Sequence, residues 1–175
     1  FNPAQSEDVE YFRTFYYFKS RPIEFKSNCI TPEEGDLSWS ITDLTFDVGA
    51  SIALEEYQTT LCTLKFPFKI PKFTIEKKGL YDKFMHIADL KDIDYKNYEG
   101  LSKSYIVKVE NEDQMNEFLS DELKAYFMES DIHHYESNGE AILIFNKNLR
   151  VAKIKEHAEI IKCAEELQRL IKSKR

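Results

Sequence analysis

The sequence contains few residues that interrupt regular structure, and it has no long apolar run. Among 175 residues there are only five glycines and five prolines, against thirteen phenylalanines and ten tyrosines. This composition favours a packed core over disorder. No run of about eighteen apolar residues occurs, and no secretory signal peptide is visible. At this length we expect residues 1–175 to form a single soluble domain that does not itself cross a membrane.

Positive charge and cysteine are also scarce. The formal net charge is −7, so the chain lacks the lysine and arginine surplus with which dedicated nucleic-acid binders neutralise phosphate. The three cysteines, Cys29, Cys62 and Cys163, are an odd number without CxxC spacing. This pattern is typical of reduced, mostly buried thiols in an intracellular protein, and it argues against a zinc site or a disulfide framework. We expect no nucleic-acid partner.

Hydrophobic patterns predict strands in the first part of the chain. Residues 9–18 are aromatic on both faces, which predicts a buried β-strand. Residues 19–36 hold two prolines and several charges, which predicts a loop with at most a short strand or one helical turn. Residues 38–48 and 55–68 alternate with a period of two. They predict an antiparallel pair joined by residues 49–54.

The rest of the chain mixes short strands with helices. The expected elements are a strand at 73–75, a helix at 78–90, a strand at 104–110, two helices capped by Asn111 and Ser120, a hairpin at 132–145 and an amphipathic helix at 151–175. Asn138-Gly139 predicts a type I′ turn in the hairpin. The apolar stripe expected on the last helix is Val151, Ile154, Ala158, Ile161, Ala164, Leu167 and Ile171.

This order of elements predicts an α+β fold. Neighbouring strands are joined mostly by turns, so we expect a mainly antiparallel sheet packed against three or four helices, one of them the C-terminal amphipathic helix. Pro67 and Pro71 mark a weak boundary. It divides a β-rich half, residues 1–68, from a helix-rich half, residues 71–175.

Four aspartates and a histidine lie close together in residues 72–95. They are Asp82, Asp89, Asp92, Asp94 and His86. A calcium loop started at Asp92 places Asp94 third, but Lys96 fifth and Asn97 sixth, where an oxygen ligand and a glycine are needed. The histidine and the first aspartate are four residues apart, as in a surface pair on a helix. We interpret this stretch as structural and expect no metal site.

His133 and His134 form the other histidine pair of interest. Adjacent residues of a strand project to opposite faces, so the two rings diverge and cannot chelate one ion. We expect His133 to share a face with Tyr135 and Ile144, and His134 to share one with Phe145. At least one ring should be partly buried and hydrogen-bonded, which is a structural role.

Catalytic motifs are missing from the sequence. There is no GxSxG, no P-loop and no GxGxxG, and five glycines leave little material for a phosphate-binding loop. None of the cysteines has a histidine near it in sequence, although the members of a catalytic triad need not be neighbours in sequence. We therefore expect no catalytic, cofactor-binding or metal-binding residue, and no cofactor.

Basic residues are interleaved with apolar ones in two segments. They are Lys65, Lys69, Lys72, Lys77 and Lys78 in one segment, and Lys19, Arg21 and Lys26 in the other. Such residues can rest on an anionic membrane surface, each contributing about 1 kcal/mol. The alternative, which we favour, is a solvated strand edge protected by lysines.

Several short motifs follow one another in an order that resembles a group of uncharacterised bacterial proteins. The motifs are Asp43, Gln58-Thr59, Pro71 with Phe73 and Glu76, Asp92-Ile93-Asp94-Tyr95, and Leu101-Ser102 with Tyr105. In that group a membrane-anchoring N-terminal part precedes a soluble α+β domain. The resemblance covers residues 38–130. It implies a cytoplasmic domain tethered through a membrane segment upstream of Phe1, with DIDY as a structural turn and no catalytic residue to transfer.

Three functional interpretations remain open. The leading one is a non-enzymatic domain that acts through contacts with a protein partner or near the membrane surface. The second is a small-molecule or lipid-binding module, because aromatic-rich sheets covered by helices often hold an apolar pocket. The third is a hydrolase or transferase built from dispersed residues, which predicts a group with a perturbed pKa in a cleft.

Overall fold

The structure is a computed structural model that describes residues 9–32, 38–47, 56–79, 90–92, 100–146 and 150–173. Its strands are β1 (Ile23–Ile30), β2 (Trp39–Asp47), β3 (Glu56–Lys65), β4 (Phe73–Lys77), β5 (Lys91–Asp92), β6 (Tyr105–Val109), β7 (His134–Ser137) and β8 (Ala141–Phe145). Its helices are the 3₁₀-helix η1 (Tyr11–Thr14) and the α-helices α2 (Tyr16–Lys19), α3 (Leu101–Ser104), α4 (Glu112–Phe118), α5 (Asp121–Glu129) and α6 (Ile154–Ser173).

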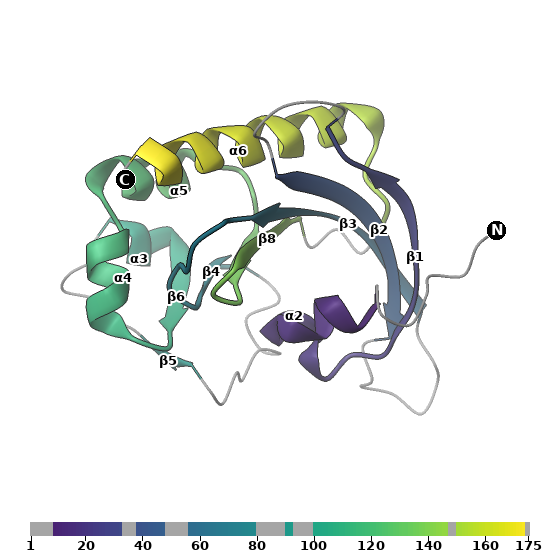
Figure 1. Ribbon diagram of the computed structural model, residues 1–175, viewed down its shortest axis with the longest axis horizontal. Coiled ribbons are helices and arrows are strands. Elements are labelled where there is room, and N and C mark those ends of the chain that lie inside the picture. Colours follow the sequence, from purple (N-terminus) through teal and green to yellow (C-terminus); the bar gives the residue numbers. More distant parts are fainter. Residues whose placement is uncertain are drawn as a thin grey trace.

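The strands form one curved sheet in the order β1-β2-β3-β8-β7-β4-β6-β5 (Figure 1). All neighbouring strands are antiparallel, which confirms the predicted α+β fold. The pair β2–β3 is the one that alternation predicted. Because β3 pairs with β8, the sheet continues from the β-rich half into the helix-rich half.

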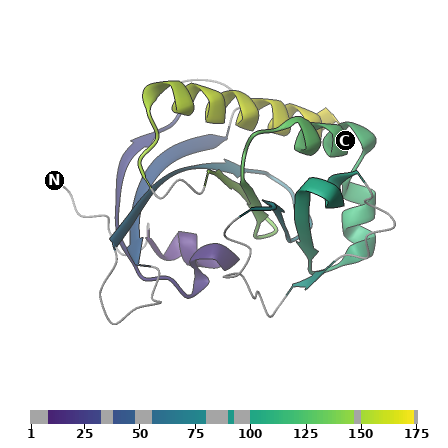
Figure 2. The ribbon, with the colours of Figure 1, turned by 180° about the vertical axis from the view of Figure 1, so that it is seen from behind.

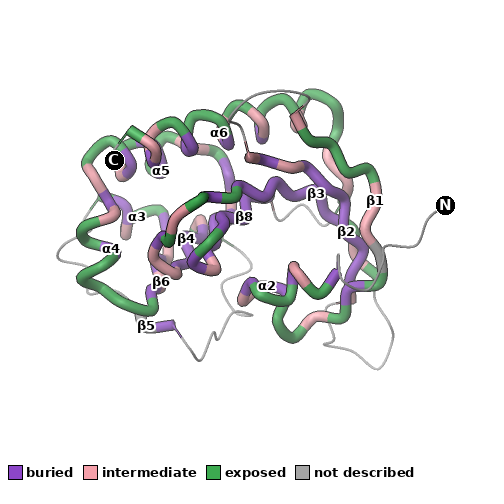
Figure 3. The backbone as a smooth tube through the Cα atoms, viewed as in Figure 1, coloured by how far each residue is buried: buried purple, intermediate pink, exposed green. Residues whose placement is uncertain are grey.

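One face of the sheet, which we call the α6 face, packs against α3, α4, α5 and α6 (Figure 2). Ile41, Cys62, Ile144, Tyr135 and Ile75 lie in successive strands across it. All five are at most 1% exposed. Figure 3 shows that buried positions run unbroken along β8, while α6 alternates between buried and exposed. This face holds the larger core of the molecule.

The opposite face, which we call the aromatic face, is formed by Leu44, Phe46, Leu61, Leu143 and Phe145. It packs against residues 9–19, the N-terminal segment, which contains η1 and α2 (Figure 1). The four buried aromatic side chains of η1 to α2 are Phe12, Phe15, Tyr17 and Phe18. Burying each one contributes about 1.5–3 kcal/mol relative to exposure.

Two predictions for the beginning of the chain are wrong. Residues 9–18 are helical turns and not a strand, because Phe12, Phe15, Tyr17 and Phe18 all pack toward one sheet face instead of lying on both sides of a strand. Residues Ile23–Ile30, expected in a loop, form the eight-residue edge strand β1. Asn28 has a φ of 50°, beside an irregularity in the pairing with β2.

The predicted helix starts are confirmed. The Asn111 side chain accepts a hydrogen bond from Gln114 N at 3.1 Å, which caps α4. The Ser120 hydroxyl accepts one from Leu123 N at 3.3 Å, which caps α5. The predicted helix at 78–90 lies almost entirely outside the described residues.

The predicted hairpin is confirmed, but its turn is not type I′. Among the described residues only Gly139 and Asn28 have positive φ, and a type I′ turn requires positive φ at both central positions. Gly139 has φ 99° and precedes Glu140 in the turn, while Asn138 N donates to Ala141 O at 3.2 Å. The Asn138 side chain accepts hydrogen bonds from Glu140 N and Ala141 N and so closes the turn from inside.

The predicted apolar stripe of α6 is right in its second half and wrong in its first. Ala164, Leu167 and Ile171 are buried, as expected. Ile154 is 88% exposed, and Ile160 is buried in its place on the packed side of the helix. The Ile154 side chain therefore points away from the sheet, although Ala152, two residues earlier, donates its backbone N–H to Thr60 Oγ1 in β3 at 2.8 Å. No helix in the described part of the chain has the length and apolarity that a membrane span requires.

Candidate functional site

Most of the aspartate-rich stretch lies outside the described residues. Asp82, His86, Asp89 and Asp94 lie outside the described residues, and of Asp92 only the backbone, in β5, is described. Among the residues that the structure describes, no group of three or more His, Cys, Asp and Glu side chains could hold a metal ion. The interpretation of this stretch as structural stays a prediction.

Of the two histidines, His134 is the first residue of β7 and His133 immediately precedes the strand. His134 shares its face with Phe145, its partner across the β7–β8 pair, and its side chain is fully buried. The His134 ring packs against the rings of Tyr17 and Phe145, with centroid distances of 5.4 and 4.6 Å. His133 is half-buried, and its backbone N–H donates to Asn146 Oδ1 at 3.0 Å.

His134 joins two carboxylates in a buried polar cluster, which consists of Glu76, His134 and Glu136. The distance from His134 Nε2 to Glu136 Oε2 is 3.1 Å, and from His134 Nδ1 to Glu76 Oε2 it is 3.6 Å. The latter exceeds hydrogen-bond length, and Nδ1 has no hydrogen-bond partner. Glu136 accepts hydrogen bonds from the backbone N–H groups of Tyr16 and Tyr17, the latter at 3.1 Å. The cluster therefore joins β4 and β7 to α2.

The interleaved basic residues are engaged within the molecule. Lys69 pairs with Glu140, Lys72 with Glu110, Lys77 with Asp131, and Lys78 Nζ donates to the Ser102 carbonyl. Lys65 and Arg21 lie over the rings of Tyr11 and Tyr17, at 5.0 and 4.1 Å from the centroids. Most of these contacts are at the surface, where such pairs contribute about 0–1 kcal/mol and exchange readily with other partners.

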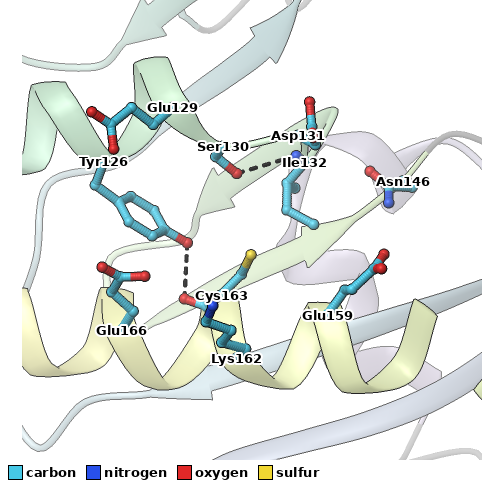
Figure 4. Close-up of a pocket in the computed structure, with 10 residues that line it drawn as sticks. All are labelled: Tyr126, Glu129, Ser130, Asp131, Ile132, Asn146, Glu159, Lys162, Cys163 and Glu166. Atoms are coloured by element: carbon cyan, nitrogen blue, oxygen red, sulfur yellow. Dashed lines mark hydrogen bonds between the residues drawn. The ribbon is translucent and has the colours of Figure 1, made fainter. Parts of the chain in front are cut away.

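A cavity of about 340 Å³ opens between the end of α5, the chain leading into β7, and α6 (Figure 4). Four carboxylates line it: Glu129 and Asp131 from the α5 side, and Glu159 and Glu166 from α6. Lys162 is the only basic residue among the lining residues. In Figure 4 the side chains of Glu159, Cys163 and Glu166 rise from α6 toward the opposite wall.

A chain of hydroxyl groups begins at the inner wall of this cavity, where Tyr126 and Ser130 line it, and continues into the core. Tyr126 OH donates to the Cys163 carbonyl at 2.8 Å, and Tyr135 OH donates to Tyr126 OH at 3.3 Å. Ser130 Oγ lies 2.5 Å from Tyr135 OH. Since the Tyr135 proton points to Tyr126, the Ser130 hydroxyl donates to Tyr135. Tyr105 OH closes the network by donating to the Ser130 carbonyl at 2.8 Å.

The ionisable groups of this wall stay neutral near pH 7. Burial raises the pKa of Tyr126 and of Tyr135 above the ordinary value of tyrosine. Burial also raises the pKa of the Cys163 thiol. A thiol becomes a good nucleophile when its pKa is lowered, so the cavity wall offers hydrogen bonds and polar contacts rather than an activated nucleophile.

Sequence reasoning missed both the cavity and the buried polar cluster. The signal for the cavity was Glu159, Lys162 and Glu166 on one side of α6, which reads equally well as a solvated helix face. Glu136 lies two residues before the Asn138 turn and looks like an exposed turn residue. Only the antiparallel pairing of β4 with β7 places Glu136 and His134 beside Glu76 and Thr74.

Comparison with known proteins gives a fold but no family. No protein-family model matches the chain, and no curated protein matches it. Among solved structures, the chain is similar to the crystal structure of the mycobacterial trehalose monomycolate transport factor A, TtfA. The TM-score is 0.51 at 10% sequence identity, over 95% of this chain and 96% of that one. This similarity shows that nearly the whole chain shares its fold with that transport factor.

Proposed function

We propose that this protein is a non-enzymatic binding domain that holds a cationic group of a partner protein in the α5–α6 cavity. The observation that carries the proposal is the cavity lining, with four carboxylates and one lysine around about 340 Å³. That volume lies at the lower end of the range of ligand pockets, which is about 300–1,000 Å³. It suits a side chain or a small head group.

Electrostatics and hydrogen bonding select the same kind of ligand. The carboxylates of Glu129, Asp131, Glu159 and Glu166 are on exposed residues around the opening. Their summed negative potential steers a lysine or arginine side chain toward the cavity, more strongly at low salt than at high salt. Inside, the neutral hydroxyl groups of Tyr126 and Ser130 line the cavity and can accept further hydrogen bonds.

The described acid and base groups favour binding over catalysis. The buried polar cluster brings three such side chains together, but Glu136 is already occupied by two backbone N–H groups and by His134. Both His134 and Glu136 have 0% of their side chain exposed. A general acid or base must come within about 3 Å of its substrate, and this burial prevents that contact as long as the N-terminal segment covers the cluster.

The test uses a decalysine peptide as the probe and isothermal titration calorimetry as the measurement. The variant Glu159→Gln/Glu166→Gln removes two charges from the cavity, and Glu24→Gln/Glu112→Gln removes two from exposed sites in β1 and α4. We expect the first variant to weaken binding about tenfold, or about 1.4 kcal/mol, and the second to change it less than twofold. Equal losses in both variants would show a diffuse charge effect and contradict the proposal.

A second candidate function is the binding of an apolar, lipid-like ligand. Two observations favour it: the fold shared with a transport factor, and the row of aromatic and aliphatic side chains along the aromatic face. That face is covered by the N-terminal segment, so a ligand would have to replace this segment. Native mass spectrometry beside the denatured mass tests it directly, since a co-purified ligand adds mass.

We also propose that the domain works in the cytoplasm beside a membrane, tethered through an upstream segment. The lysines near residues 65–78 support this, because surface ion pairs such as Lys72–Glu110 can be exchanged for anionic head groups. Flotation of the intact protein with phosphatidylserine liposomes tests it. If Lys69→Glu/Lys72→Glu/Lys77→Glu leaves flotation unaltered, the surface contact is excluded.

A further inference from the structure

The N-terminal segment has little helical stability of its own. η1 and α2 contain four residues each, far below the length at which a helix is stable in water. Neither begins with a side-chain cap: Glu10 and Phe15 occupy the N-cap positions and make no capping hydrogen bond. By contrast, Asn111 and Ser120 cap α4 and α5 from within the same stretch of chain.

The missing cap of α2 is supplied by a residue about 120 positions away. Glu136 accepts from Tyr16 N and Tyr17 N, the first two N–H groups of α2. Its side chain is fully buried in the sheet. A carboxylate at this place satisfies N–H groups that would otherwise lack acceptors, so the backbone of α2 depends on Glu136.

Further polar contacts fasten the same segment. The Tyr17 ring contacts both the His134 ring and the Arg21 guanidinium, and Arg21 Nη1 donates to the Tyr17 carbonyl. Near the other side of the segment, Asn138 Nδ2 donates to Thr14 Oγ1 at 2.8 Å. The groups around Glu136 that carry or can carry charge are thus His134, Glu76 behind it, and Arg21 across the Tyr17 ring.

We propose that the N-terminal segment is a displaceable cover over a binding site for an acyl chain, and that Glu136 is the residue that holds the cover closed. This inference rests on the second candidate function and is independent of the α5–α6 cavity. When η1 and α2 move away, they uncover a strip of Leu44, Phe46, Leu61, Leu143 and Phe145. At one end of the strip lies the buried polar cluster.

The uncovered face selects an apolar occupant. All five side chains of the strip are hydrocarbon or aromatic and at most 1% exposed in the closed state. Water or a polar ligand would leave that surface without favourable contacts, whereas an acyl chain restores the buried area that Phe12, Phe15 and Phe18 provided. His134, with its unpartnered Nδ1, and Glu76 would then face the polar end of the ligand.

The cover is tested by hydrogen–deuterium exchange with mass spectrometry on the intact chain. In Glu136→Leu, whose side chain cannot accept a hydrogen bond, we expect amides of residues 9–19 to exchange at least about tenfold faster than in the wild type, while those of residues 160–171 stay unchanged. Glu136→Gln keeps one acceptor oxygen without the charge and should give an intermediate rate. Glu140→Gln, an exposed neighbour in the same hairpin, serves as the control.

The site is tested with a fluorescent fatty acid, 11-(dansylamino)undecanoic acid, as the probe. If closing the cover limits binding, the apparent Kd falls by the same factor by which opening rises, and Glu136→Leu binds at least about tenfold more tightly than the wild type. If the amides of residues 9–19 exchange faster in Glu136→Leu but the probe does not bind more tightly, the acyl-chain site is excluded, whereas the displaceable cover is supported. If the amides of residues 9–19 exchange as slowly in Glu136→Leu as in the wild type, the proposal of a displaceable cover is wrong.

A milder variant protects this test against global unfolding. Thr14→Ala removes two exposed hydrogen bonds, the one from Asn138 and the one that Thr14 donates to the Tyr11 carbonyl, and leaves the sheet interior intact. We expect about a twofold to fivefold faster exchange, confined to residues 9–19. If Glu136→Leu accelerates exchange throughout the chain and Thr14→Ala leaves residues 9–19 as protected as in the wild type, the segment is an inseparable part of the core and the proposal is wrong.

Discussion

Both faces of the sheet carry fully buried side chains, but the two faces are covered in different ways. The α6 face is covered by α3 to α6, and its helices α4 and α5 carry their own caps. The aromatic face is covered by two four-residue helical turns whose cap comes from Glu136, in the sheet itself. Burial alone therefore does not show whether a segment can leave the sheet separately. That depends on whether the hydrogen-bond partners of its backbone lie within the segment or elsewhere in the chain.

This difference predicts how each face responds to loss of a core side chain. Phe127 on the α6 face and Phe18 on the aromatic face are both 0% exposed. Phe127→Ala should lower the free energy of unfolding by about 3–5 kcal/mol, because α5 cannot leave the core separately. Phe18→Ala should lower the free energy of unfolding by clearly less than Phe127→Ala does, because the N-terminal segment can detach while the sheet stays folded. Urea unfolding followed by circular dichroism measures both values.

The control for this pair is Met128→Ala. Met128 is 51% exposed beside Phe127, so its loss should change the free energy of unfolding by no more than about 0.5 kcal/mol. If Phe18→Ala and Phe127→Ala cost the same, the two faces are equally integrated and the contrast between them fails.

The same contrast explains what the sequence could predict. Alternation predicted β2 and β3, and local caps predicted α4 and α5, because each of these signals acts between residues close in the chain. The N-terminal segment has no such signal. Its run of aromatic residues fits a two-sided strand as well as a helical turn, and the group that decides between them, Glu136, is remote.

The candidate sites were beyond prediction for a related reason. The α5–α6 cavity needs the end of α5 and the middle of α6 to be placed against each other, which no spacing within the sequence encodes. The exposed position of Ile154 shows the same limit. Helical periodicity placed it on the apolar stripe, but its side chain lies on the side of α6 that faces away from the core.

The next largest effect on stability is expected in the turn between β7 and β8, because these two strands contribute buried side chains to both faces of the sheet. Gly139 has φ 99°, a conformation that side-chain-bearing residues rarely adopt, although a Cβ there would meet Lys72 only at an ordinary 3.5 Å. Gly139→Ala should therefore destabilise the protein by about 1–2 kcal/mol through backbone strain. At Gly79 nothing lies within 4 Å of an added Cβ and φ is not positive.

Gly79→Ala is thus the matched control, and it should be neutral or stabilise by up to about 1 kcal/mol. Thermal unfolding of both variants compares them directly. A neutral Gly139→Ala would mean that the turn relaxes easily, and that the register shared by the two faces does not depend on it.

Removing a local cap tests the α6 face more gently. Ser120→Ala deletes the acceptor for Leu123 N and should cost about 1 kcal/mol of unfolding free energy. Ser173→Ala, at the far end of α6, should stay within about 0.5 kcal/mol. A loss in Ser120→Ala that is confined to residues 121–129 in hydrogen exchange would show that α5 also opens separately, which would weaken the distinction between the faces.

The smallest effect concerns the start of α6, at the surface. Glu156 accepts from Arg150 Nη1 at 2.8 Å and from Lys153 N at 2.6 Å. The hydrogen bonds from Arg150, helped by that from Lys153 N, lower the pKa of Glu156 from 4.5 to about 2. Because this pKa is lower in the folded state, its stabilisation is complete above about pH 4.5 and is lost as pH falls through about 2.

Arg150→Ala should move the pKa of Glu156 back toward 4.5 and remove most of that acid-range dependence. NMR titration of the Glu156 carboxyl group measures this change in pKa. Lys155→Ala, at the adjacent position of α6, is the control and should leave the pKa of Glu156 unchanged. Lys153 N still donates in Arg150→Ala, so α6 keeps its local start even without the arginine. A wild-type Glu156 that titrates near 4.5 would show that α6, like α2, is not fixed by its own neighbouring residues.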